Sequence, residues 1–88
     1  MIRKHILFFG EVQGVGFRYH SYYKARSLGL TGWVLNRYDG SVEMEVQGSR
    51  EDIDALILHL KAQNYIYIES MQMKTIPVIE ERSFERID

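Results

Sequence analysis

The feature that most constrains this chain is an apolar run that ends in two closely spaced glycines. Residues 4–12 are nearly all apolar, which predicts a strand that is covered on both faces. Gly14 and Gly16 interrupt this run, and apolar side chains then recur at helical spacing over residues 17–28, with Gly29 as a C-terminal stop. The chain must therefore pass directly from a strand into a helix through a short glycine-containing turn.

The middle of the chain predicts a hairpin followed by a second helix. Residues 30–36 and 41–47 have the composition of strands, and Asp39-Gly40 between them is a strong hairpin-turn signal. Ser49 is the predicted cap of the helix that follows. Its buried face is predicted from four apolar residues that match the i, i+3, i+4, i+7 pattern: Ile53, Leu56, Ile57 and Leu60.

A further strand around residues 68–75 completes the order β-α-β-β-α-β, and Phe84–Ile87 can add a short fifth strand. This order predicts an α+β fold, a ferredoxin-like two-layer α/β sandwich. Both helices lie on one face of an antiparallel sheet, with the first and third strands in its middle. Since no linker or repeat interrupts the chain, we expect residues 1–88 to form a single domain. Many functions share this fold, so the site must indicate the function.

Composition excludes several classes of protein. The chain has no Cys, which excludes a disulfide framework, a thiolate nucleophile and a cysteine-ligated metal, and which fits a cytoplasmic protein. No apolar run is long enough to span a membrane, so we expect no membrane partner. A net charge of −1 argues against a general nucleic-acid binder. However, the charges are unevenly distributed along the sequence. Residues 1–38 contain six basic residues and one acidic residue, whereas residues 39–88 contain five basic and eleven acidic residues, which suggests a local anion site in the first part.

The turn after the first strand is the best candidate for that anion site. Gly14 and Gly16 allow consecutive backbone N–H groups to point into one concavity, and the N-terminus of the next helix adds unpaired N–H groups. Arg18, in the first helical turn, can bring a guanidinium that grips two phosphate oxygens. The turn is neither a nucleotide P-loop nor a dinucleotide-binding fingerprint, because it lacks Gly-Lys-Ser/Thr and a third glycine at the required spacing.

These residues resemble the acylphosphatase signature in two consecutive parts. The first part is Val12-Gln13-Gly14-Val15-Gly16-Phe17-Arg18, and the second is Leu28-Gly29-Leu30-x-Gly32-Trp33-Val34-x-Asn36-x-x-Asp39-Gly40-x-Val42-Glu43. The match runs without a gap from Gly10 to Gly48, a little under half of the chain. Later residues depart from the family pattern. Ala62-Gln63-Asn64-Tyr65 replaces its Pro/Gly-rich turn, and the closing Phe-x-Ile is one residue longer, as Phe84-Glu85-Arg86-Ile87, which leaves the register of the last strand open.

The resemblance implies a hydrolase that cleaves acyl phosphates to a carboxylate and inorganic phosphate, without a metal or cofactor. Arg18 and Asn36 are the implied catalytic residues, and Asn36 orients the attacking water. The implied phosphate ligands are Gln13, Gly14, Val15, Gly16, Phe17 and Arg18. These roles agree with phosphoryl-transfer chemistry, which needs stabilised charge and a positioned nucleophile more than covalent help. A neutral amide can both donate to and accept from a water.

Two other classes of function share some of these features. An RNA-binding module shares the element order, but it needs aromatic residues on the third strand, where this chain has Glu43 and Glu45. A non-catalytic phosphate- or anion-binding module needs the same loop, yet it has no need of Asn36 to position water. We expect a small-molecule acyl phosphate as partner, inorganic phosphate as product, no nucleic acid and a monomer.

The remaining polar residues have weaker functional predictions. His20 could tune the electrostatic field of the site, although packing is the simpler role, and Ser21 could bond either near the loop or back along its helix. His5 and His59 have no partner at metal-ligand spacing, so we assign no metal. The sequence identifies no pocket for the acyl part of a substrate, and so it does not name the natural acyl phosphate.

Overall fold

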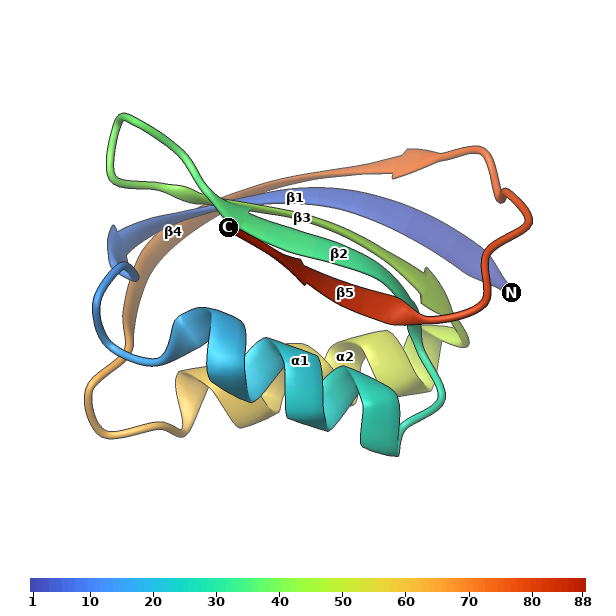
Figure 1. The fold of residues 1–88 in the computed structure, drawn as a ribbon, viewed down its shortest axis with the longest axis horizontal. Coiled ribbons are helices and arrows are strands. Elements are labelled where there is room, and N and C mark those ends of the chain that lie inside the picture. Colours follow the sequence, from blue (N-terminus) through green and yellow to red (C-terminus); the bar gives the residue numbers. More distant parts are fainter.

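A computed structural model describes all 88 residues and contains five strands and two helices (Figure 1). Short loops connect most of these elements, and a longer segment, residues 77–83, precedes the last strand. The elements, in chain order, are β1 (Ile2–Glu11), α1 (Phe17–Ser27), β2 (Thr31–Asn36), β3 (Val42–Gly48), α2 (Arg50–Lys61), β4 (Tyr67–Ile76) and β5 (Phe84–Ile87).

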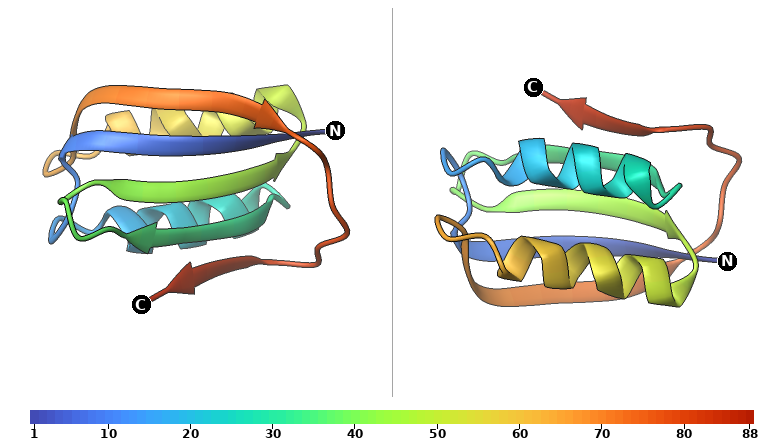
Figure 2. Two further views of the ribbon diagram at one scale, coloured as in Figure 1. Left: turned by 90° about the horizontal axis from the view of Figure 1, so that it is seen from above. Right: turned by 90° about the horizontal axis from the view of Figure 1, so that it is seen from below.

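The strands form one sheet in the order β4-β1-β3-β2-β5, and both helices cover the same face of it (Figures 1 and 2). This arrangement confirms the predicted fold, including the interior positions of the first and third strands. The four strands of the β-α-β-β-α-β core pair antiparallel, as expected. The fifth strand forms and pairs parallel to β2, with Gly32 opposite Phe84, so the complete sheet is mixed.

Strand β1 has only one fully covered face. Ile6 and Phe8 point toward the helices and are completely buried, whereas Leu7 and Phe9, on the opposite face, are half-buried. The prediction of a strand covered on both faces was therefore wrong. β1 lies between β3 and β4, and side chains of these neighbouring strands flank its second face in place of another layer of helices.

The helices bury the faces that their apolar spacing indicates, with one shift. Ser49 caps α2, because its Oγ accepts a hydrogen bond from the Asp52 N–H at 3.1 Å, and all four predicted core residues of α2 are buried. The apolar spacing of α1 predicts a buried face of Tyr22, Ala25 and Leu28. Ala25 is buried, together with Phe17 and Ser21, whereas Tyr22 and Leu28 are half-buried. The shift turns Tyr22 toward β5.

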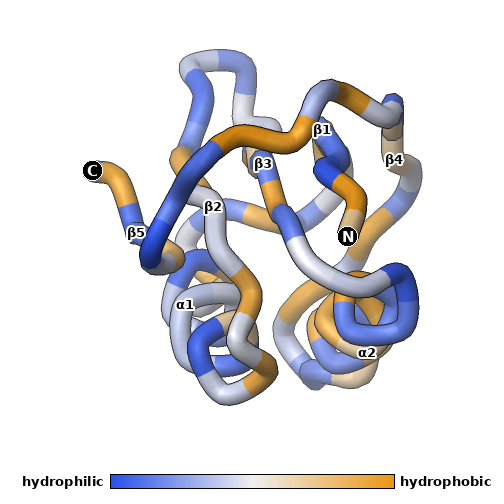
Figure 3. The backbone as a smooth tube through the Cα atoms, turned by 90° about the vertical axis from the view of Figure 1, so that its right-hand side faces the viewer, coloured by the Kyte–Doolittle hydropathy of each residue, from blue (hydrophilic) through white to orange (hydrophobic).

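Residues 77–83 carry the chain from β4 at one edge of the sheet to β5 at the other (Figure 2). They pass the end of the sheet on the side opposite the helices (Figure 3). Gln47 of β3 fixes this segment by bonding both backbone groups of Ile79: its Oε1 accepts from the N–H at 3.0 Å, and its Nε2 donates to the carbonyl at 2.8 Å. The route of this segment is what allows β5 to pair parallel to β2.

Arg3 completes the attachment of this segment. Its side chain is 1% exposed, donates to Glu45 at 2.9 Å, and grips both carboxylate oxygens of Glu81 at 2.7 and 3.3 Å. The hydrogen bond with Glu81 raises the pKa of Arg3 above its ordinary value. A buried cation thus joins β1, β3 and the segment that leads to β5.

We predict that Arg3→Met lowers the free energy of unfolding by about 2–4 kcal/mol, because it leaves two largely covered carboxylates without their cation. Urea unfolding of the variant and the wild type measures the difference. Arg82→Met is the matched control, since Arg82 is exposed on the same segment. Equal stability of the two variants would contradict a structural role for the buried arginine.

Candidate active site

The loop between β1 and α1 is held at both ends by buried side chains. Val12 is 1% exposed and Phe17 is 2% exposed, and the Phe17 ring packs on Phe8 with ring centroids 4.8 Å apart. Between these anchors, Gly14 and Gly16 adopt φ angles of 72° and 83°, which residues with a Cβ rarely adopt. Such left-handed turns aim neighbouring backbone N–H groups into one concavity.

Helix α1 begins at this concavity without a side-chain cap. Gly16 is the N-cap residue, and its carbonyl accepts the first helical hydrogen bond, from the His20 N–H at 2.9 Å. The N–H groups of the first turn therefore have no intrahelical partner, and no side chain satisfies them. Unpaired N–H groups at the positive end of a helix are a ready site for an anion.

Arg18 projects from the first turn of α1, and the end of β5 holds its guanidinium. Nη1 donates to the Ile87 carbonyl and to Asp88 Oδ1, both at 2.8 Å. Both of these bonds use one nitrogen, so the N–H groups on Nε and Nη2 remain available to a ligand. Contacts within the protein thus orient the side chain while they leave a fork of donors unused.

Asn36 lies across the cavity from α1, as the last residue of β2. It shares a face of the strand with Gly32 and Val34, which are buried, but it is itself exposed at the strand tip. A cavity of about 330 Å³ brings Asn36 together with Arg18 and the loop glycines. Its complete lining is Val12, Gly14, Gly16, Phe17, Arg18, Tyr19, Asn36, Arg86 and Asp88.

Two of the predicted loop residues do not line this cavity. Val15 is half-buried and packs against the hydrophobic core. The Gln13 side chain instead ties the loop to the β2–β3 hairpin, because its Nε2 donates to the Arg37 carbonyl at 2.7 Å and to the Ser41 carbonyl at 2.8 Å. The loop is therefore fastened to the hairpin that carries Asn36, a contact that no spacing in the sequence indicates.

The hairpin itself has the predicted turn and is stabilised by Asp39. The Asp39 carboxylate accepts hydrogen bonds from the backbone N–H and the hydroxyl of Ser41, and these bonds lower the pKa of Asp39 below its usual value. Such a bond from a side chain to the backbone two residues on is typical of a tight turn. The turn, together with the Gln13 contact, defines where β2 ends and where Asn36 lies.

Sequence reasoning missed Arg86 and Asp88 as cavity residues. The register of β5 had remained open, and the structure fixes it by pairing Val34 with Arg86. Strand alternation then places Phe84, Arg86 and Asp88 on the same side. Phe84 is fully buried, so its two alternate neighbours point toward α1 and the cavity. Counting by two from Phe84 could have indicated both residues.

The other polar candidates lie around the site and do not enter it. The His20 ring lies beside Gly16 and 5.6 Å from the His59 ring, measured between centroids. Burial, with a smaller contribution from Lys24, lowers the pKa of His59. Ser21 bonds back along its helix, to the Phe17 carbonyl at 2.8 Å.

His5 contacts Glu43 at 2.7 Å on the sheet face opposite the helices. No three His, Asp or Glu side chains lie close enough together to hold a metal ion. Neither helix is long and apolar enough to cross a membrane.

Comparisons of sequence and of structure both find acylphosphatases among the proteins similar to this chain. The sequence model of the acylphosphatase family matches residues 4–86. The acylphosphatase of Bifidobacterium longum is 44% identical to the chain, in an alignment that covers 92% of this chain and 84% of the relative. The acylphosphatase of Clostridium beijerinckii is 37% identical, in an alignment that covers 91% of this chain and 90% of the relative. The crystal structure of acylphosphatase from Bacillus subtilis superposes with a TM-score of 0.90 over 100% of both chains, at 29% identity. As the pattern of its loop and second strand predicts, the chain belongs to the acylphosphatase family of hydrolases.

Proposed function

We propose that the chain hydrolyses acyl phosphates to a carboxylate and inorganic phosphate, and that the cavity between the loop, α1 and the end of β2 is the active site. The observation that carries this proposal is that one cavity is lined by three kinds of group: Gly14, Gly16 and the uncapped start of α1, Arg18 with its free donors, and the exposed Asn36.

In this proposal the loop and Arg18 bind the phosphoryl group. The backbone N–H groups satisfy its oxygens from one side, and Nε and Nη2 of Arg18 form a bidentate contact from the other. The negative charge on these oxygens is best stabilised by donors that are already oriented before the substrate arrives. The bonds from Arg18 to Ile87 and Asp88 supply this preorganisation.

Asn36 positions the attacking water. Its amide offers a carbonyl oxygen that accepts and an NH₂ group that donates, so a water can be oriented at the phosphorus without a proton acceptor of high pKa. A carboxylate is a good leaving group, and therefore strong general-acid catalysis is unnecessary. We propose for the same reason that the reaction proceeds without a metal, with charge on the phosphoryl oxygens balanced by Arg18 and the loop.

The alternative is a non-catalytic module that binds phosphate or another anion at the same loop. The loop and Arg18 would be sufficient for such a module, which would not need Asn36 to position a water. The position of Asn36 in the same cavity as Arg18 favours the hydrolase. An assay of the Asn36 variant separates the two functions.

We predict that wild-type protein hydrolyses benzoyl phosphate rapidly and that Asn36→Ala reduces the rate to near background, because the water loses its orientation. Ultraviolet absorbance follows the reaction, and circular dichroism checks that the variant is folded. Asn64→Ala, in the exposed turn after α2, is the control that should retain activity. Phosphate binding without turnover by the wild type would favour the anion-binding module.

We predict that Arg18→Ala lowers kcat by at least about 100-fold with the fold intact, the size of effect seen when one preorganised charge-stabilising donor is removed. Arg26→Ala is the matched control. Arg26 also bonds β5, through the Phe84 carbonyl and Glu85, but it lies outside the cavity. A raised KM with unchanged kcat would contradict a role for Arg18 in the transition state.

We predict that EDTA leaves the rate of benzoyl phosphate hydrolysis unchanged, since the proposed mechanism uses no metal. Protein dialysed against EDTA is assayed before and after addition of Mg²⁺, Zn²⁺ or Mn²⁺. A rate that depends on any of these ions would contradict the metal-free mechanism, while leaving the assignment of the cavity to be tested by the Arg18 and Asn36 variants.

A further inference from the structure

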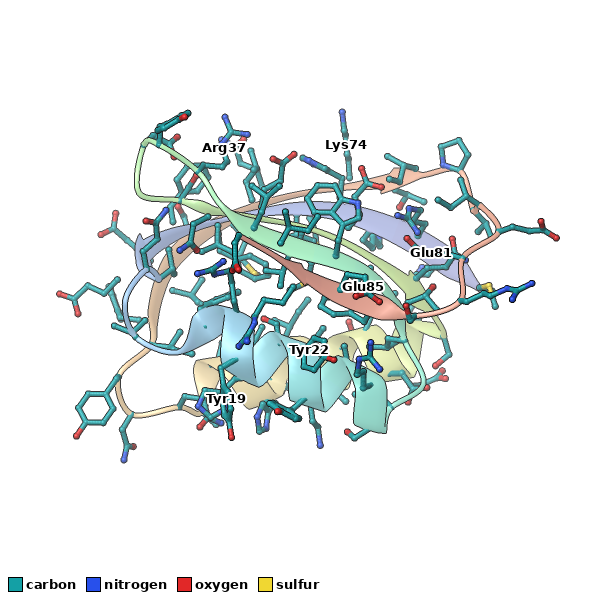
Figure 4. All side chains as sticks on the ribbon, in the orientation of Figure 1. Tyr19, Tyr22, Arg37, Lys74, Glu81 and Glu85 are labelled. Atoms are coloured by element: carbon teal, nitrogen blue, oxygen red, sulfur yellow. The ribbon has the colours of Figure 1, made fainter.

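Polar and charged side chains form the contact between α1 and β5, which we call the α1–β5 seam: Arg18, Tyr22 and Arg26 of the helix with Glu85, Arg86 and Asp88. Arg18, Tyr22 and Arg26 are four residues apart on α1 and therefore share one face of the helix. Tyr22 lies between the helix and β5 (Figure 4). The two arginines each bond β5 and each have a carboxylate partner: Arg18 pairs with Asp88 at 2.8 Å, and Arg26 pairs with Glu85 at 3.3 Å.

Arg86 is the cation of this seam that has no carboxylate partner. Its guanidinium lies over the Tyr22 ring, 5.8 Å from the centroid, and Arg26 lies over the same ring at 4.5 Å. An aromatic face attracts a guanidinium and limits where it can go, but it uses none of its five N–H donors. Arg86 also lines the cavity that contains Arg18. Two arginines, Arg18 and Arg86, and one acidic residue, Asp88, therefore line the same cavity.

The position of Arg86 differs from that of the groups that would hold a phosphate. The loop and Arg18 lie at the start of α1, whereas Tyr22, over whose ring the Arg86 guanidinium lies, is one helical turn, about 5.4 Å, further along the helix. A phosphoryl group in the loop would already have the N–H groups and the Arg18 fork as partners. The spacing of one helical turn instead suits a second negative group, joined to the phosphate through a short acyl chain.

The sequence of β5 explains why a cation occupies this position. Two residues after the buried Phe84, where the acylphosphatase signature has isoleucine, this chain has Arg86, and its isoleucine follows at position 87. Ile87 is 41% exposed. In this chain, Arg86 therefore lies on the face of β5 that points to the cavity, and Ile87 lies on the other face.

We propose, on the basis of the proposed function, that Arg86 is a specificity-determining residue that binds a second anionic group on the acyl part of the substrate. The preferred substrates are then acyl phosphates of short acids that carry a further carboxylate or phosphate. Arg86 would thus select the acyl group of the substrate, which the sequence of the loop does not identify.

The test compares two substrates of the same length and shape, fumaryl phosphate and crotonoyl phosphate, which differ by a carboxylate in place of a methyl group. The trans double bond also prevents the carboxylate from attacking its own anhydride. We expect wild-type kcat/KM to favour fumaryl phosphate by roughly 10-fold, the effect of one charge-assisted contact at a half-open site. Release of inorganic phosphate measures both rates, and added KCl should reduce the preference.

Arg86→Gln should remove most of this preference while it costs crotonoyl phosphate far less than fumaryl phosphate. Arg86→Lys should keep part of it, since it retains the charge and loses the planar fork. Arg82→Gln, an exposed arginine outside the cavity, should match the wild type. Equal losses on the two substrates would overturn the proposal, because Arg86 would then act on the phosphate or on Arg18. An unchanged preference would also overturn it.

A binding measurement keeps this test independent of turnover. Calorimetry compares 4-phosphonobutanoate with butylphosphonate, which again differ by a carboxylate in place of a methyl group. We expect tighter binding of the carboxylate compound by wild type and a loss of that difference in Arg86→Gln. Failure of wild type to hydrolyse crotonoyl phosphate would contradict the proposed function itself. Equal affinity for the two phosphonates would contradict the role of Arg86.

Discussion

The packing of Phe17 on Phe8 is the interaction on which the site depends. It fixes the first residue of α1 against the centre of the sheet, and buried Val12 fixes the end of the preceding strand. Only residues 13–16 remain to join the two anchors, and a connection this short must reverse direction through left-handed backbone conformations at two glycines. The left-handed turn at Gly14 and Gly16 is thus a consequence of the core packing on either side of it.

The other wall of the cavity is built from residues that are distant in sequence. Arg18 is oriented by β5, and the Gln13 side chain fastens the loop to the hairpin that ends β2. β5 reaches its place because Arg3 and Gln47 attach residues 77–83 to the sheet. Each of these contacts is a polar bond between residues distant in sequence, and together they orient Arg18 and fasten the loop to the hairpin.

Local patterns in the sequence were sufficient for most of the fold. The helix over α2, the Asp-Gly hairpin and the glycine turn each depend on residues within a few positions of one another, and all three are present. Arg18 and Asn36 could be proposed from a motif, and the structure places them in one cavity. In physical terms, these features are specified by backbone propensities and by apolar periodicity.

The parts that could not be predicted depend on long-range pairing. The parallel register of β5, and with it the inward position of Arg86, follows from a route across the sheet that no neighbouring residues specify. The burial of Arg3 is equally hidden, because a lone arginine in a strand usually indicates a solvent-exposed position. The prediction that both faces of β1 are buried was wrong. An apolar run looks the same whether a second layer of helices covers the strand or only the side chains of neighbouring strands flank it.

The bond from Arg18 to Asp88 joins residues 70 positions apart, and this separation has a consequence for the order of events during synthesis. A ribosome releases the glycine loop and α1 long before it releases β5. The loop between β1 and α1 is therefore present early on a growing chain, while Arg18 still lacks the partners that orient it. Arg18 gains the partners that orient it only after residues 87 and 88 have emerged, so the direction of a side chain near the start of α1 is set by residues that are made much later.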